Sequence, residues 1–559
     1  MHIGELLKQE GLITAEQLQQ AMQDRSGDAS ITDVLIDQLS IDENRILELL
    51  AREFHCEVLH AVDDCMLDAE LVADLPVEFA RTRHLLPIRH EGEIALLTND
   101  PAAAIDHTDL SLLLGVEPQP LLAPRALIRA SIEKCYFHKT ESTEDMIDRL
   151  DHSTDRPSSA ASGDEADLLR SSDQAPVTQL VNQILLEALK ENASDIHIEP
   201  FEQSIRVRFR LDGVLYDRPA PPKALESSLS SRLKIMAKLD IAEKRLPQDG
   251  MARVKVGERE IDVRVSTVPV AEGERIVLRL LRHDTAHLTL SELGMGGKLL
   301  DRFKQLLAEP HGVIWVTGPT GSGKTTTLYA ALQELDTDRT NVLTIEDPIE
   351  YQLAKIGQIA VKPKIGLTFS KGLRHILRQD PDIILVGETR DMETAEIVVQ
   401  ASLTGHLVFS TLHTNDALSA MTRLSDMGVE RFLVAESTRA VMAQRLVRRL
   451  CTDCRQAYTP ESTEVDVFGE AGKAISGKTI YRAEGCANCR EGFTGRIGIF
   501  ELHLLSSEMQ EAIRTKGSLT ALRKIAERDQ TPALIDDAIE KVANGLTSLD
   551  EIHAALGRT

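Results

Sequence analysis

A chain of 559 residues is too long for one hydrophobic core, and a prior of about 150 residues per domain suggests three or four units. The hydrophobic fraction of 42% and the charged fraction of 27% are typical of a folded protein. The formal net charge of -25 argues against nucleic acid as a main partner, because nucleic-acid affinity depends largely on lysine and arginine side chains that neutralise phosphates.

The first residues, MHIGELLKQEG, lack the apolar core of a signal peptide, and no apolar run approaches the roughly 18 residues of a membrane span. We therefore expect a cytoplasmic protein whose membrane contacts go through a partner. Disulfides are improbable in that compartment. Four of the seven cysteines form two C-x-x-C pairs, and the scattered Cys56, Cys65 and Cys135 are expected to be buried as small apolar side chains.

Residues 1–150 alternate helical periodicity with short apolar runs. Segments 3–18 and 31–46 share apolar positions, which predicts two small helical repeats, followed by an α/β part, within a mostly helical N-terminal domain. Residues 151–175 are rich in serine and aspartate and have no apolar period. This composition indicates a flexible linker.

Residues 176–285 begin with apolar side chains at helical spacing and then change to a period of two. In the run IRVRFRL, which starts at residue 205, the arginines are expected to face away from the apolar side chains. Asp212 and Gly213 follow directly and are typical of a hairpin turn. The pattern predicts a small α+β domain with one arginine-rich sheet face.

From about residue 286, apolar strands alternate with helices, which predicts an α/β fold with a mostly parallel sheet covered on both sides. The segment GPTGSGKTT lies between such a strand and a helix and fits the P-loop pattern. Its backbone N–H groups are expected to surround phosphate oxygens, while Lys324 reaches the β and γ phosphates and Thr325 binds Mg²⁺. The predicted ATP-binding residues are Gly318, Pro319, Thr320, Gly321, Ser322, Gly323, Lys324, Thr325 and Thr326.

Three further strand ends carry polar side chains: TIEDPIE, ILVGETRD and HLVFSTLHTND. Gly387 stands where P-loop ATPases usually place an aspartate, and Glu388 follows it. A P-loop site needs a carboxylate for its metal and its water, so we expect Glu388 and the Glu346 neighbourhood to supply it. A solvated acidic cluster is the alternative for Glu346. His413 is expected near the γ-phosphate, while a functional and a structural role are both open for His406.

The segments CTDC and CANC offer two tetrahedral half-sites for a metal ion. They predict a structural zinc site in a module spanning residues 446–497, and two buried cysteine pairs are the alternative. No histidine or glutamate that would activate water stands beside these cysteines, so the zinc is expected to stabilise the fold. The predicted ligands are Cys451, Cys454, Cys486 and Cys489.

The four strand-end motifs resemble, in chain order, the Walker A motif, Asp box, Walker B motif and His box of the secretion traffic ATPases, in which Walker B lacks the aspartate. Connecting segments such as ASDIHIEPFE and RLPQDG resemble the type II secretion ATPases, and type IV pilus assembly ATPases are the alternative. The resemblance implies a PAS-like domain, then a RecA-like P-loop ATPase core at 286–505, and a helical segment at 506–559. It implies ATP, Mg²⁺ and Zn²⁺ as cofactors.

The resemblance also implies a homo-hexamer in which the 176–285 domain of one subunit covers the nucleotide. Arg210, Arg264 and Arg275 match positions near the family's basic residues and are predicted to reach the γ-phosphate; a solvated face paired with acids is the alternative. The N-terminal region is expected to bind a cytoplasmic segment of an inner-membrane platform protein. Hydrolysis would then build a pseudopilus that exports folded proteins.

Some relatives bind cyclic di-GMP through an Arg-Leu-Gly opening of each N-terminal repeat. Here residues 2–4 are His-Ile-Gly and residues 30–32 are Ser-Ile-Thr, which argues against that ligand, although residues 11–13 keep Gly-Leu-Ile.

Two other function classes compete with an ATP-driven motor. One is a P-loop scaffold that binds nucleotide without hydrolysis, and the other is a zinc-containing nucleic-acid translocase, which the negative charge opposes.

Overall fold

The computed structural model describes residues 43–72, 75–101, 108–139, 176–256, 259–281, 288–515 and 518–557, together with a few isolated positions. Contacts divide the chain into two compact units, Met1–Leu280 and Leu281–Thr559. The predicted N-terminal repeats and the linker lie almost wholly outside the described residues. Among the residues that are described, no helix has both the length and the apolar character needed to cross a bilayer.

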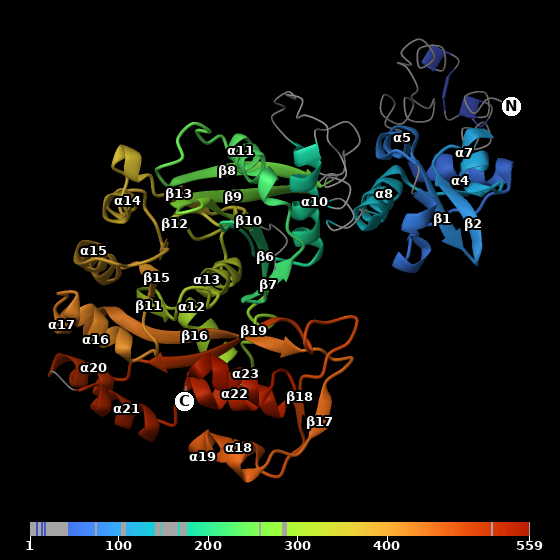
Figure 1. Ribbon diagram of the computed structural model, residues 1–559. Coiled ribbons are helices and arrows are strands. Elements are labelled where there is room, and N and C mark those ends of the chain that lie inside the picture. The colour runs from blue at the N-terminus through green and yellow to red at the C-terminus, as the bar shows by residue number, and fades with distance from the viewer. Residues whose placement is uncertain are drawn as a thin grey trace. The chain divides into compact units, whose positions relative to one another are not determined.

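Residues 43–139 form a three-stranded sheet with helices packed against it (Figure 1). Strands β1 and β2 pair antiparallel, and β2 and β3 pair parallel. Ile88 and Leu97 of the sheet are buried in the same core as Ile128 and Ile132 of the last helix. The elements are α4 (Glu43–Phe54), η1 (Asp64–Met66), η2 (Ala69–Val72), α5 (Val77–Arg83), β1 (Leu85–His90), β2 (Glu93–Thr98), α7 (Thr108–Leu114), β3 (Gln119–Leu122) and α8 (Arg125–Lys139).

The second part of this unit is a seven-stranded sheet of order β4-β8-β9-β10-β5-β6-β7. Its helices are α10 (Pro176–Lys190), η3 (Lys223–Leu225) and α11 (Glu226–Met236). Its strands are β4 (Ala166–Asp167), β5 (Asp195–Pro200), β6 (Ile205–Leu211), β7 (Val214–Arg218), β8 (Gln248–Val256), β9 (Arg259–Val270) and β10 (Gly273–Leu281).

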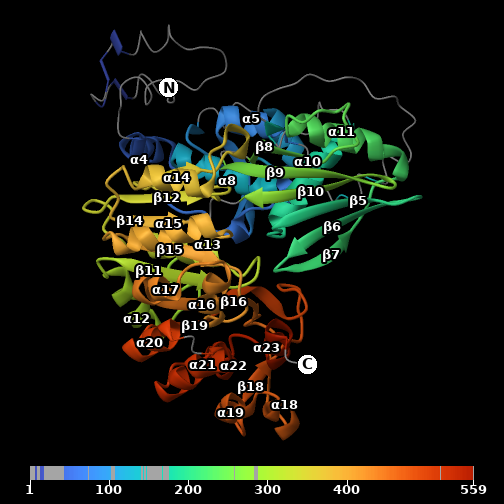
Figure 2. The same ribbon diagram turned by 90° about the vertical axis from the view of Figure 1, so that its left-hand side faces the viewer.

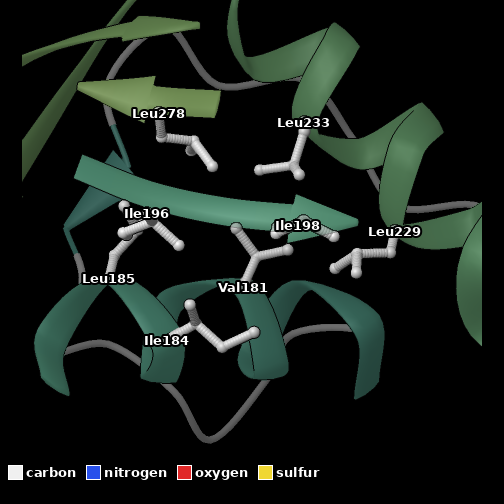
Figure 3. A pocket seen from close by; sticks show the side chains of 8 residues that line it. All are labelled: Val181, Ile184, Leu185, Ile196, Ile198, Leu229, Leu233 and Leu278. Carbon is white, nitrogen blue, oxygen red and sulfur yellow. The ribbon is translucent and has the colours of Figure 1, made fainter. Parts of the chain in front are cut away.

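Burial alternates along β6, which confirms that its apolar side chains and its arginines lie on opposite faces. The apolar face packs on α10 and α11, where aliphatic side chains such as Val181, Ile196, Leu229 and Leu278 line a small apolar space (Figure 3). Asp212 and Gly213 both have positive φ angles and form the predicted hairpin turn between β6 and β7. The arginines therefore lie on the sheet face away from these helices.

The second unit is built on a seven-stranded sheet of order β13-β12-β14-β15-β11-β16-β19. The strand pairings of this sheet are parallel except for β16 with β19, so the predicted mostly parallel sheet is confirmed. Its strands are β11 (Gly312–Thr317), β12 (Val342–Glu346), β13 (Gly357–Ala360), β14 (Ile383–Val386), β15 (Leu407–Leu412), β16 (Thr438–Leu450) and β19 (Phe493–Leu504).

Helices cover both faces of this sheet. One face packs on α12 and α13, and its core includes Ile314 of β11 and Leu328 of α13. The opposite face carries Trp315 and packs on α14, α15, α16, α17, α20 and α21 (Figure 2). These helices are α12 (Gly297–Leu307), α13 (Lys324–Gln333), α14 (Phe369–Ile376), α15 (Met392–Leu403), α16 (Ser419–Asp426), α17 (Arg431–Ser437), α20 (Ser507–Arg514) and α21 (Leu519–Arg528), with η5 (Pro363–Ile365) before α14.

A smaller core lies at the far end of β16 and β19, beside the two-stranded sheet of β17 and β18 (Figure 1). Its buried residues include Val447 of β16, Ile475, and Ile539 and Val542 of α22. The chain's last helices are thus part of the fold of this region. The elements are β17 (Gln456–Tyr458), α18 (Ser462–Asp466), α19 (Gly469–Gly472), η6 (Lys473–Ile475), β18 (Ile480–Arg482), α22 (Leu534–Ala543) and α23 (Leu549–Leu556).

Candidate nucleotide site and cysteine cluster

The P-loop connects the fully buried strand β11 to helix α13. Gly318, Gly321 and Gly323 all have positive φ angles, which residues with a Cβ adopt at a cost. A Cβ on Gly318 would lie 2.4 Å from the carbonyl oxygen of Gln444 and 2.7 Å from Ser322 Oγ. The loop therefore requires glycine, and its backbone lies at the helix N-terminus, where N–H groups can line a phosphate cradle.

Lys324 closes back over this loop. Its ammonium donates to the carbonyl oxygens of Gly318, at 2.8 Å, and Pro319, at 3.1 Å. Burial lowers the pKa of Lys324 to about 8, and the charge of Glu388 opposes that shift only in part. Burial disfavours the charged form of Lys324, and an anion bound beside it would stabilise that form. The cradle and Lys324 together therefore fit a nucleotide phosphate.

Glu388 follows the carboxyl end of β14, next to His413 at the end of β15. Its Oε1 lies 2.8 Å from Arg390 Nε, and its Oε2 lies 3.9 Å from His413 Nε2. Burial and the nearby Lys324 ammonium lower the pKa of His413. The imidazole is therefore neutral at pH 7. Lys324, Glu388 and His413 interact at the ends of the adjacent strands β14, β15 and β11, as the motifs predicted.

The loop that carries Glu388 is fastened to β15. The Thr389 N–H donates to the carbonyl oxygen of Thr411 at 3.0 Å, and the Thr411 hydroxyl donates to the carbonyl oxygen of Gly387 at 2.7 Å. The hydroxyls of Thr389 and Ser410 lie 2.7 Å apart. These bonds fix the backbone on both sides of Glu388.

The two predicted histidines lie at opposite ends of β15. His406 precedes the strand, and its Nδ1 lies 2.8 Å from the carbonyl oxygen of Ala401 and 3.2 Å from the Thr404 hydroxyl. It caps the end of α15, far along the strand from His413. The structure therefore gives His406 a structural place and separates it from the predicted site.

Glu346 differs from Glu388 in its surroundings. Its side chain is 3% exposed and accepts hydrogen bonds from Thr344, Gln358 and the Tyr329 hydroxyl. A Cβ on the neighbouring Gly387 would lie 3.3 Å from Glu346 Cα. Sequence reasoning named Glu346 but missed Tyr329 and Gln358, and it also missed Gln444, whose carbonyl and amide pack on the P-loop glycines.

The three predicted arginines all lie on the exposed sheet face of the first unit, and each contacts a carboxylate there. Arg210 Nε is 3.7 Å from Asp195, and Arg275 Nη2 is 2.6 Å from Glu199. Arg264 Nη2 is 4.0 Å from Asp249. Their side chains are 35%, 45% and 42% exposed, respectively, so solvent reaches each guanidinium.

The four cysteines of the two C-x-x-C pairs converge on one point. All four sulfurs lie within 4.8 Å of one another, with Cys451 to Cys486 at 3.9 Å and Cys454 to Cys489 at 3.5 Å. Tetrahedral zinc with Zn–S bonds of about 2.3 Å places its sulfurs about 3.8 Å apart. The donor set and its spacing therefore fit zinc.

The cysteines outside this cluster follow the prediction only in part. Cys135 is buried as expected, Cys56 is half-buried, and Cys65 is exposed, so the expectation was wrong for Cys65. Within the cluster, hydrogen bonding from the backbone of Asp453 lowers the pKa of Cys451 to about 7. The pKa values of Cys454 and Cys486 are raised, in part by burial and by the neighbouring thiols, so zinc binding must displace protons there.

A sequence model described as "Type II/IV secretion system protein" matches residues 170–554. The chain belongs to this family. The chain is therefore a secretion ATPase, and ATP is its substrate. A second model, described as "MshEN domain", matches residues 61–142. That range includes neither opening triplet of the N-terminal repeats.

Curated relatives cover most of the chain. The type II secretion system ATPase E of Vibrio cholerae is 53% identical over 387 residues, which are 69% of this chain and 76% of that protein. The type IV pilus assembly ATPase PilB of Myxococcus xanthus is 39% identical over 557 residues, 98% of each chain. The solved structure of the ATPase DotB from Yersinia pseudotuberculosis covers 72% of this chain and 98% of its own, with a TM-score of 0.52 at 20% identity. At this level of identity, the likeness supports the fold of this secretion ATPase and nothing about its role.

Proposed function

We propose that this chain is the hexameric ATPase that powers type II secretion at the cytoplasmic face of the inner membrane. One observation carries the proposal: Lys324, His413 and Glu388 meet at the ends of adjacent strands, while Gly387 fills the place of the usual aspartate. This set of groups is suited to phosphoryl transfer to water, a reaction that depends on positioning and on neutralising charge.

Each group has a role that follows from its surroundings. Lys324 exchanges its two carbonyl contacts for phosphate oxygens and so neutralises charge that develops there. Glu388 orients the attacking water, because its carboxylate is close enough to Lys324 to raise the pKa of that ammonium. Neutral His413 donates a hydrogen bond without adding charge. Thr325 would hold Mg²⁺, which would supply positive charge against the phosphate oxygens.

The remaining positive charge is proposed to come from a neighbouring subunit of the hexamer. Arg210, Arg264 and Arg275 are part-exposed on one sheet face, so they are accessible to a ligand once the nearby carboxylates release them. A guanidinium supplied to a transferring phosphoryl group raises its rate by about 10³ to 10⁵. An isolated subunit is therefore expected to hydrolyse ATP slowly.

Zinc is proposed as a structural ion bound by the four clustered cysteines. Cys451 lies directly after β16, the strand that pairs with the P-loop strand β11. Zinc binding at that point would stabilise the end of β16 and the small core around it.

Secretion is favoured over pilus assembly by the level of identity, which is 53% to the Vibrio cholerae secretion ATPase and 39% to the Myxococcus xanthus pilus ATPase. The full-length match to the pilus ATPase keeps pilus assembly as the second candidate. In either case residues 1–150 are proposed to bind the cytoplasmic part of an inner-membrane platform protein.

The test is genetic and uses the native cell. Deleting the gene should leave normally secreted proteins inside the cell envelope while surface pili persist, and the wild-type chain should restore export. Lys324→Ala should not restore it, whereas Lys371→Ala, which changes an exposed lysine on α14, should. Loss of pili with normal export would support pilus assembly, and unchanged export and pili would contradict both candidates.

A further inference from the structure

Glu346 is enclosed by three hydrogen-bond donors from three different elements. Its Oε1 accepts from the Thr344 hydroxyl at 2.5 Å and from Gln358 Nε2 at 3.2 Å, and its Oε2 accepts from the Tyr329 hydroxyl. A carboxylate offers about four acceptor positions. Three are filled here, so one position on Oε2 is left for a further donor such as a water molecule.

Tyr329 connects this carboxylate to the phosphate cradle. It lies on α13, the same helix that begins with Lys324, and its side chain is fully buried. Burial, and then the charge of Glu346, raise the pKa of Tyr329, so the phenol keeps its proton and acts as a donor. The ring of Tyr351 packs edge-on against it with centroids 4.7 Å apart, which fixes the ring plane.

Gln358 connects Glu346 to the loop that follows β12. Its Oε1 accepts from the Leu353 N–H at 2.7 Å, which leaves Nε2 to donate toward Glu346, Tyr329 and the carbonyl oxygen of Tyr351 at 3.2 to 3.3 Å. Since its acceptor atom is already bound to the backbone, the amide is held with its donor atom toward the carboxylate. Its orientation is set by this network.

We propose that Tyr329 and Gln358 are positioning residues that hold the Glu346 carboxylate in one orientation for ATP hydrolysis. The inference rests on the proposed ATP hydrolysis, and it takes from the sequence the expectation that Glu346 serves the metal or the water. A buried carboxylate with donors on both oxygens does not rotate, so its open acceptor position keeps one direction. Partners of this kind typically change activity or metal affinity about 10- to 100-fold when removed.

The test compares two tyrosines of one aromatic pair. Tyr329→Phe removes the hydroxyl that binds Glu346, and Tyr351→Phe removes a hydroxyl that takes no part in binding it. In the full-length, zinc-loaded chain, we expect Tyr329→Phe to lower kcat about tenfold with KM for ATP unchanged within twofold, and Tyr351→Phe to leave kcat within twofold. Gln358→Leu, which removes a second donor, should lower kcat in the same way.

A double-mutant cycle separates positioning from a general loss of structure. In the Glu346→Gln background, adding Tyr329→Phe should lower kcat no further, because the group it positions is gone. Binding of a fluorescent ADP without Mg²⁺ should remain unchanged in Tyr329→Phe, and the additional rise in melting temperature that Mg²⁺ with ADP produces should shrink. The inference would be overturned if Tyr329→Phe lowered kcat by the same factor in the Glu346→Gln background as in the wild-type background. A wild-type kcat in Tyr329→Phe would overturn it as well.

Failure of the inference is distinct from failure of the proposed function. If Glu346→Gln abolishes hydrolysis while Tyr329→Phe does not, Glu346 is catalytic and needs no positioning by Tyr329. If Glu346→Gln keeps wild-type kcat, the proposed role of Glu346 itself is wrong, and the positioning inference falls with it.

Discussion

Gly387 and Glu346 lie so close that a Cβ on Gly387 would stand 3.3 Å from Glu346 Cα, 3.6 Å from its Cγ and 3.2 Å from the carbonyl oxygen of Ile345. The N–H of Gly387 donates to that same carbonyl at 2.8 Å. An aspartate at 387 would therefore need space that β12 occupies, and its charge would face a buried carboxylate. This close approach disfavours a charged side chain at position 387.

Introducing the usual aspartate should harm this enzyme. Gly387→Asp is expected to lower the free energy of unfolding by about 1–3 kcal/mol through crowding and to reduce kcat. Gly387→Ala adds only the Cβ and should have the smaller effect of the two. Thermal unfolding and steady-state hydrolysis measure both quantities. A Gly387→Asp chain that is as stable and as active as wild type would contradict the steric account.

Nucleotide binding should weaken as pH rises through about 8. Burial lowers the pKa of Lys324 to about 8 in the free protein. Phosphate raises that pKa, so binding above pH 8 must take up a proton, and affinity falls as pH rises. Titrations of ADP between pH 7 and pH 9.5 measure this dependence.

Lys324→Arg provides the matched control, because arginine stays charged throughout this range. Its affinity for ADP, whatever its absolute value, should change little between pH 7 and pH 9.5. An equal fall in affinity in both chains would assign the pH dependence to another group.

Zinc should stabilise the region at the end of β16. Cys486→Ser removes one of four converging sulfurs, so we expect it to lose the bound zinc and to lower the melting temperature. Cys65→Ser changes an exposed cysteine outside the cluster and should do neither. Metal analysis is expected to find one zinc per wild-type chain. Equal zinc content in Cys486→Ser would show that the cysteines do not bind it together.

Arginines that act on a neighbour's nucleotide can be identified by mixing subunits. Arg210→Ala keeps an intact P-loop and Glu388, whereas Glu388→Gln keeps an intact arginine face. Each chain alone should hydrolyse ATP at least about 10³-fold more slowly than wild type. In mixed hexamers, some neighbouring subunits combine an intact P-loop and Glu388 from one chain with an intact Arg210 from the other. The activity of the mixture should therefore exceed the sum of the activities of the two separate chains. Activity equal to that sum would place Arg210 outside the site.

The fold and the strand-end groups were predictable because each has a local pattern. The P-loop has fixed spacing between a strand and a helix, and parallel strands bring their carboxyl ends to one edge. Glu388, His413 and Lys324 could therefore be placed together from sequence. The alternation that exposes the arginines of β6 follows from the two-residue period of a strand.

Contacts between distant segments have no such pattern. Nothing in the spacing of Tyr329, Glu346 and Gln358 indicates that they share hydrogen bonds, although a tyrosine inside a buried helix signals that its hydroxyl needs a partner. For residues 506–559 the sequence predicted only a helical segment. In the structure Asp537 of α22 accepts from the N–H of Phe500 at 2.7 Å and binds the buried Lys541, so charged residues there complete a core.

The most direct test of the account is steady-state phosphate release from the assembled, zinc-loaded chain with Mg²⁺ and ATP, measured for wild type and for Glu388→Gln. The account predicts sustained release by wild type and its near-complete loss in Glu388→Gln, with nucleotide binding retained in both. Sustained release by Glu388→Gln at the wild-type rate would contradict the role of Glu388. No release from assembled wild type, with its membrane partner present, would contradict the hydrolysis itself.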